Sequence, residues 1–145
     1  MSHTSIDIKP GTFKYIESEI YNHQDNKREI NRLRMEILNP TKEVDTNIVY
    51  GPLQKGEPVR TTEVMATRLL TNKMLRNLEE MVEAIEYVYN QLPEEHKKVI
   101  RLKYWNKDRN LKMEQIGDEC HMHRNTVTTV RKAFVKAIAI QVGMK

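Results

Sequence analysis

The chain has 145 residues, of which 39% are hydrophobic and 30% charged, with a formal net charge of +4. This length suits one domain or two small helical modules, and it leaves no room for a large enzyme with a deep cleft. Glycine and proline number only five each, while the helix-favouring residues Glu, Lys, Leu, Met and Arg are plentiful. The composition therefore predicts an all-α protein.

No apolar run approaches the roughly 20 residues that cross a bilayer. The first residues also lack the basic start and apolar stretch of a secretory signal. The single cysteine, Cys120, cannot form an intramolecular disulfide and fits a reducing compartment. We therefore expect a cytoplasmic protein with no membrane partner.

Positive charge is concentrated near the C-terminus. Residues 1–91 hold 12 Lys+Arg against 14 Asp+Glu, a net of −2, whereas residues 92–145 hold 12 against 6, a net of +6. The last 25 residues contain five basic side chains and no acidic one. Because local positive charge drives phosphate binding, this half is expected to hold a nucleic-acid surface. The alternative is a solvated basic face.

The first half of the chain predicts two long helices joined by a loop. Apolar residues at helical spacing favour one continuous helix from Thr12 to Leu38, although the polar stretch 22–27 would also allow a break. Residues 39–60 contain three prolines and two glycines and predict a linker. A second long helix is expected to begin near Thr61, with a threonine as its N-cap.

The second helix carries an apolar stripe with nearly the spacing of a coiled coil. Its members are Leu70, Met74, Leu78, Met81, Ile85, Val88 and Leu92. The stripe fits either a dimerising helix or packing on the preceding helix of the same chain. The predicted division is therefore a helical and oligomerising region at 1–91 and a second domain at 92–145, so a homo-oligomer is expected.

The second domain predicts three further helices. Pro93 stands at the expected first position of a helix that runs to about Trp105, and a polar turn follows at 106–110. Two helices joined by a tight turn then fill Lys112 to Phe134. The apolar spacing breaks at 120–123 and resumes at Val127, as a helix-turn-helix requires.

The last helix alternates an apolar stripe with polar side chains that suit the DNA major groove. Arginine can bridge two acceptors of guanine, asparagine can bridge adenine, and threonine can meet the thymine methyl group or a phosphate. The candidate residues on this helix are Arg124, Asn125, Thr128, Thr129, Arg131 and Lys132. We therefore expect double-stranded DNA to be the partner.

The pattern LP-x-x-x-K/R-x-V-I-x-L-x-Y, then M-E-Q-I-G, then H-R-N-T-V resembles region four of bacterial sigma factors. In that family Gly117 would stand where two helices cross. The sequence departs from the family at His121, where a glycine with positive φ is usual, and at His123, where a serine cap is usual. The departure at His123 weakens the expected cap, so the sequence leaves the start of the recognition helix open by one residue.

Taken whole, the chain resembles the RinA group of phage transcriptional activators, which are related to ArpU-type regulators. The resemblance rests on the order of helices and on the LPEEHKKVIRLKYW segment. It implies activation of late phage genes for DNA packaging and virion assembly in a Gram-positive host. Bacterial RNA polymerase is a further candidate partner. Carried onto this chain, it implies base contacts by Arg124, Asn125 and Thr128, and phosphate contacts by Arg131, Lys132, Lys136 and Lys112.

Other functions fit the sequence less well. Cys120, His121 and His123 lack the paired spacing of a structural zinc site, and no catalytic set is visible, so neither metal, cofactor nor enzymatic activity is expected. A small-terminase-like packaging protein remains an alternative, although its DNA-binding part normally comes first. The sequence also allows a sigma-like factor bound to RNA polymerase, or an interaction module that no longer binds DNA.

Overall fold

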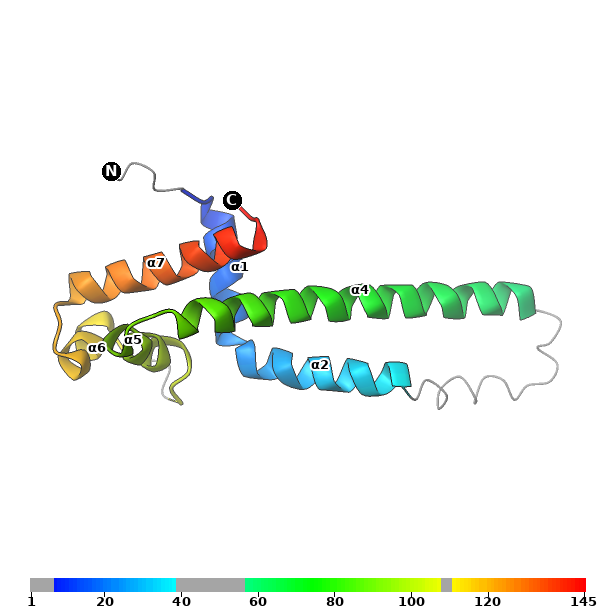
Figure 1. The fold of residues 1–145 in the computed structure, drawn as a ribbon, viewed down its shortest axis with the longest axis horizontal. Helices are drawn as coiled ribbons and strands as arrows, with labels where there is room; N and C mark the ends of the chain where they lie inside the picture. Colours follow the sequence, from blue (N-terminus) through cyan, green and yellow to red (C-terminus); the bar gives the residue numbers. More distant parts are fainter. Residues whose placement is uncertain (1–6, 39–56, 108–110) are drawn as a thin grey trace. The chain divides into compact units, whose positions relative to one another are not determined.

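The computed structural model describes residues 7–38, 57–107 and 111–145, with the backbone alone for 57–61. These residues form six helices and no strand (Figure 1), which confirms the all-α prediction. Among them, no helix is long and apolar enough to cross a membrane. The chain divides into two compact units, one of residues 1–24 with 81–145 and one of residues 25–80. This division differs from the predicted one at 91/92.

The predicted helix from Thr12 to Leu38 is two helices, α1 (Pro10–Tyr21) and α2 (His23–Leu38). Asn22 separates them with φ −91° and ψ 12°. The sequence marks this stretch as polar and exposed, yet His23 is buried, with its Nε2 3.2 Å from Oε2 of Glu86 and its ring against Trp105. The prediction of one helix was wrong, because Asn22 departs from helical backbone angles next to the buried His23.

The long helix α4 (Glu57–Asn90) begins earlier than the sequence predicts. Its start at Glu57 makes residues 57–60 helical rather than linker, so a threonine N-cap near Thr61 was a wrong prediction. Pro58 stands in the first turn, where a missing backbone N–H breaks no helical hydrogen bond. The remainder of the predicted linker, residues 39–56, lies outside the described residues.

The unit of residues 1–24 and 81–145 holds α1, the end of α4, α5 (Glu94–Tyr104), α6 (Met113–Cys120) and α7 (Arg124–Val142). Helix α7 packs against α1, α5 and α6, and it supplies more core side chains than any of them. The fully buried side chains of this core are Ile16, Ile20, Ile85, Val99, Ile100, Tyr104, Ile116, Val127, Phe134, Val135, Ile138 and Ala139. The core therefore holds α7 along nearly its whole length.

Pro93, predicted as the first helical residue, is the N-cap of α5, so the helix begins one residue later, at Glu94. The Pro93 carbonyl accepts from the N–H groups of His96 and Lys97. Glu94 and Glu95 occupy the first turn, and basic side chains occupy the last. This charge order complements the helix dipole and favours the short helix.

The unit of residues 25–80 consists of most of α2 and α4. Ile30 and Leu33 of α2 are buried, and Nη2 of Arg34 lies 2.6 Å from Oε2 of Glu79 on α4. Further ion pairs run along the exposed side of α2. Part of the apolar stripe predicted on α4 is exposed in this unit, since Leu70 and Met74 are not buried by α2 or by α4 itself.

Candidate nucleic-acid interface

The turn between α6 and α7 spans three residues, and His121 ends α6 in the left-handed conformation with φ 56°. The N–H of His121 donates to the Asp118 carbonyl (3.3 Å), and the N–H of Met122 donates to the Gly117 carbonyl (2.9 Å). These two bonds form a Schellman motif, which normally uses glycine at this position. His121 therefore adopts the conformation that the sequence pattern required of it.

Gly117 lies where α6 meets the start of α7. A Cβ built on Gly117 would lie 2.5 Å from the Met122 carbonyl oxygen and 3.4 Å from the Arg124 nitrogen. Both neighbours are backbone atoms, which cannot rotate away as a flexible side chain can. Only glycine fits here, as the sequence predicted for a crossing residue.

His123 is the N-cap of α7, and its Nδ1 accepts from the Asn125 N–H at 3.0 Å. The sequence left the start of this helix uncertain because serine is usual at the cap. The imidazole acceptor replaces the serine hydroxyl, and α7 begins at Arg124 without a shift. Because the cap uses Nδ1, this ring nitrogen is not available to a metal.

The side of α7 opposite the core presents four of the predicted DNA-binding residues. We call this surface the outer face of α7, and it comprises Asn125, Thr129, Lys132 and Lys136. The first three are exposed, and Lys136 is half-buried with its Nζ 3.6 Å from Oδ1 of Asp7. Their spacing of four, three and four residues places them in one row along the helix.

The other three predicted contacts near the turn lie at the edges of this surface. Arg124 is exposed, with Nη1 3.6 Å from Oε2 of Glu114 on α6. Thr128 is half-buried, and Lys112 is the exposed N-cap residue of α6. An ion pair between two side chains this exposed is weak, so Arg124 can be released to another partner at little cost.

Arg131 differs from the other predicted contacts because α1 holds its guanidinium. Its Nε lies 2.7 Å from Oε2 of Glu17 and its Nη2 lies 3.1 Å from Oε1, while the same carboxylate accepts from the Tyr104 hydroxyl at 2.5 Å. Arg131 also stacks over the ring of Phe13. Phosphate contact by Arg131 stays a prediction, and the geometry gives this residue a role in joining α1, α5 and α7.

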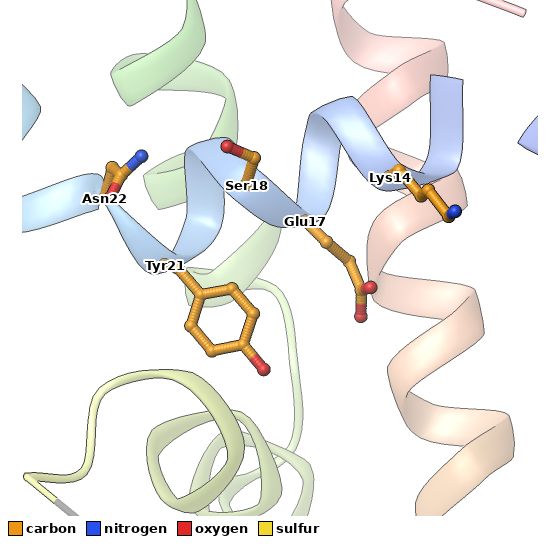
Figure 2. Close-up of a pocket in the computed structure, with 5 residues that line it drawn as sticks. All are labelled: Lys14, Glu17, Ser18, Tyr21 and Asn22. Atoms are coloured by element: carbon orange, nitrogen blue, oxygen red, sulfur yellow. The ribbon is translucent and has the colours of Figure 1, made fainter. Parts of the chain in front are cut away.

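A shallow pocket along α1 borders this network (Figure 2), and its lining residues are Lys14, Glu17, Ser18, Tyr21 and Asn22. In Figure 2, Glu17 points toward α7 and Tyr21 toward α5. The Tyr21 hydroxyl accepts from Lys103 Nζ at 2.9 Å, and the Tyr21 ring meets that of Tyr104 edge-on. The polar lining thus serves contacts between helices.

The pKa values of Glu17, Tyr104 and Arg131 are all shifted by their contacts with one another and by burial. Burial alone would raise the pKa of Glu17, but hydrogen bonds from Arg131 and Tyr104 and the charges of Arg131 and Lys103 outweigh it and lower the pKa. The pKa of Tyr104 is raised by burial and by Glu17, and that of Arg131 by its hydrogen bond to Glu17. The ionised pair is therefore the stable form at neutral pH.

Sequence reasoning placed Tyr104 on the inward side of its helix but missed the bonds that Glu17 accepts from Tyr104 and Arg131. The partners lie 114 and 87 residues apart in the chain, and no local pattern marks a glutamate on α1 as the partner of an arginine on α7. The one available signal is position: Glu17 follows the core residue Ile16, beside the face that packs inward.

Cys120 lies half-buried against the core, and burial raises the pKa of its thiol. It therefore remains a protonated, largely apolar side chain. Among the residues that the structure describes, no group of three His, Cys, Asp or Glu side chains is placed to hold a metal ion.

Comparison with known proteins gives two matches along nearly the full chain. A family model described as "Protein of unknown function (DUF722)" matches residues 14–140. The transcriptional activator RinA of Staphylococcus phage phi11 is 23% identical over 143 residues, which cover 99% of each chain. No solved structure matches significantly.

The family match begins within α1 and ends within α7, so it includes both compact units. The alignment with RinA likewise covers the chain from end to end rather than the C-terminal helices alone. This chain therefore belongs to the DUF722 family and is a RinA-like protein.

Proposed function

We propose that this protein is a sequence-specific DNA-binding transcriptional activator of a phage, and that the outer face of α7 enters the major groove. The observation that carries the proposal is the row of Asn125, Thr129, Lys132 and Lys136 on one side of a helix whose other side is fully packed. An α-helix fits the major groove, and side chains on its exposed side reach base edges and phosphates.

The charge of α7 supports this use. The helix contains no acidic residue, and besides Arg131, whose charge Glu17 of α1 balances, it carries Arg124, Lys132 and Lys136. A local excess of positive charge attracts the phosphate backbone and releases its counterions. The outer face therefore combines general attraction with side chains that can discriminate between bases.

The side chains divide into two roles by chemistry and position. Arg124 and Asn125 stand in the first turn of α7, where a recognition helix meets base edges, and they can bridge guanine and adenine respectively. Lys132 and Lys136 lie two and three turns further on and are suited to phosphates. Thr128 and Thr129 lie between these groups, and Lys112 stands at the start of α6.

The activator role is proposed from RinA, whose name describes a transcriptional activator of a Staphylococcus phage. We extend it to late genes for DNA packaging and virion assembly, with bacterial RNA polymerase as a second partner. If one side of α7 binds DNA, the remaining surface of the unit that holds α7 is available to contact a protein partner such as RNA polymerase.

Footprinting on the DNA upstream of the phage packaging genes tests the proposal. A discrete protected site of higher affinity than random DNA, together with protein-dependent transcription in a purified polymerase reaction, is expected. Equal affinity for the upstream and random duplexes would exclude sequence-specific recognition. A protected site without any increase in transcript would exclude activation while leaving DNA recognition standing.

A further inference from the structure

The exposed side of α7 carries a second row of side chains beside the outer face. Thr126, Thr129 and Ala133 are all exposed, and they follow one another at spacings of three and four residues. Such spacings place side chains in one row along a helix. We call these three residues the methyl row, because each side chain contains a methyl group. Thr129 belongs both to this row and to the outer face.

The methyl row lies between the lysines of α7 and the core. At about 100° per residue, the methyl row and the outer face are centred roughly 60° apart around the helix axis. Lys132 and Lys136 therefore flank one edge of the methyl row, and the buried Val130 flanks the other. The row itself contains no charged and no long side chain, so this strip of the exposed side offers methyl groups at its surface.

Small side chains allow a helix to approach the base edges closely. The major groove is about 12 Å wide, and an α-helix with its side chains is about 10–12 Å across, so there is little space to spare. Threonine and alanine extend only a short way from the backbone, whereas Lys132 and Lys136 are long enough to reach phosphates at the wall of the groove. A helix docked with the methyl row toward the bases satisfies both requirements.

The methyl row offers apolar contacts even at Thr129. Oγ1 of Thr129 donates to the Asn125 carbonyl oxygen, one turn earlier in α7, at 3.0 Å. The hydroxyl proton is thus used within the helix, and the methyl group is the part of Thr129 that remains for an apolar contact. Ala133 has only a methyl group to offer.

Thymine is the base that presents a matching group. Its methyl group is the apolar feature of the major groove, where the other bases present hydrogen-bond donors and acceptors. Contact between two methyl groups is favourable because both leave water. The methyl row is about 10 Å long, which corresponds to roughly three base-pair steps.

We infer that the methyl row contacts the methyl groups of thymines at successive base pairs of the bound DNA site. The inference rests on the proposed function, because it names the base that the DNA-binding helix selects. Thr126 and Ala133 thereby join Asn125 as residues that determine which sequence is bound.

Replacement of single thymines by uracil in the footprinted upstream duplex tests the inference with the full chain. Uracil pairs with adenine as thymine does and lacks only the methyl group. Uracil at a contacted thymine should lower the affinity about fourfold, the value of one methyl group removed from an apolar contact. An upstream duplex that binds no better than random DNA would refute the proposed function, and the inference with it. A specific duplex that tolerates uracil at every thymine would overturn the inference alone.

Three variants of α7 assign the contacts to side chains. Thr126→Ser and Thr129→Ser remove the methyl group from the protein and keep the hydroxyl, at exposed positions where both residue types allow a helix. Each should bind the thymine duplex about fourfold more weakly and should make uracil at one position neutral. Ala133→Ser, which sets a hydroxyl beside the thymine methyl, should do the same at a third position. The matched control is Thr67→Ser, at an exposed position of α4, which should keep every uracil effect.

The salt dependence of binding separates methyl contacts from phosphate contacts. None of these variants changes a charge, so the salt slope should equal that of the wild type. Uracil effects that persist undiminished in all three α7 variants would overturn the inference. A reduced salt slope with equal losses on the thymine and uracil duplexes would also overturn it, because the variants would then disturb the docking of α7 on the phosphates.

Discussion

Gly117 and Met122 are in contact through two backbone features that together fix the angle between α6 and α7. The Gly117 carbonyl accepts the Met122 N–H at 2.9 Å, and the missing Cβ of Gly117 leaves space for the Met122 carbonyl, which would lie only 2.5 Å from it. The orientation of the outer face of α7 therefore depends on a glycine in the middle of α6.

Gly117→Ala is expected to lower the free energy of unfolding by about 2 kcal/mol, because the added methyl meets backbone atoms that cannot rotate away. Helix propensity alone would favour alanine, so the sign of the effect is informative. The matched control is Gly11→Ala in α1, where a Cβ would have no neighbour within 4 Å. Urea unfolding should show destabilisation at Gly117 and none at Gly11; equal behaviour would contradict the close approach.

His121→Gly should raise the free energy of unfolding by about 1 kcal/mol, because glycine adopts positive φ without the steric cost of a side chain.

His123→Ala should lower the free energy of unfolding by about 1 kcal/mol, because the Asn125 N–H loses the side chain that caps it. Chemical denaturation of both variants provides the measurement. A neutral result for His123→Ala would show that the imidazole does not cap α7.

Glu17→Gln should destabilise the unit that contains α1 and α7 by about 2 kcal/mol at neutral pH, because Arg131 and Tyr104 lose a charged acceptor. The pKa of Glu17 is lowered in the folded protein, so its contribution is present above the ordinary glutamate pKa of about 4.3 and is lost as the pH falls below that value. The wild-type protein should therefore lose stability in acid.

A thermal unfolding series between pH 7 and pH 3 measures this contribution. The difference between wild type and Glu17→Gln should be largest at neutral pH and should shrink as the pH falls. Glu83→Gln, at an exposed position of α4, is the matched control and should follow the wild type throughout. A difference that is constant with pH would show that the ionised form of Glu17 is not what Arg131 binds.

The C-terminal half of the fold was predictable because its signals are local. Gly117, His121 and Val127 mark the crossing, the turn and the core at fixed spacing, and all three occupy those places. The break at Asn22 was not predictable, because it depends on His23 packing against Glu86 and Trp105, which are distant in sequence.

The candidate site was predicted as a set of residues but not in its geometry. Periodicity placed Asn125, Thr129 and Lys132 on one helix, and the packing of α7 shows that they share its exposed side. Nothing near Arg131 in the sequence shows that Glu17 binds its guanidinium, since that bond joins residues 114 positions apart. Local patterns therefore identified the surface, and tertiary packing decided which side chains it presents.

The central claim is that the outer face of α7 reads DNA, and binding of variants to a footprinted duplex across a salt series tests it most directly. Asn125→Ala should weaken binding to the specific duplex by about 1–3 kcal/mol and leave random DNA unaffected. Lys132→Ala should weaken binding to both duplexes and reduce the salt slope by about 1, whereas the control Lys14→Ala on α1 should change neither. Unchanged affinity and salt slope in both α7 variants would contradict the claim.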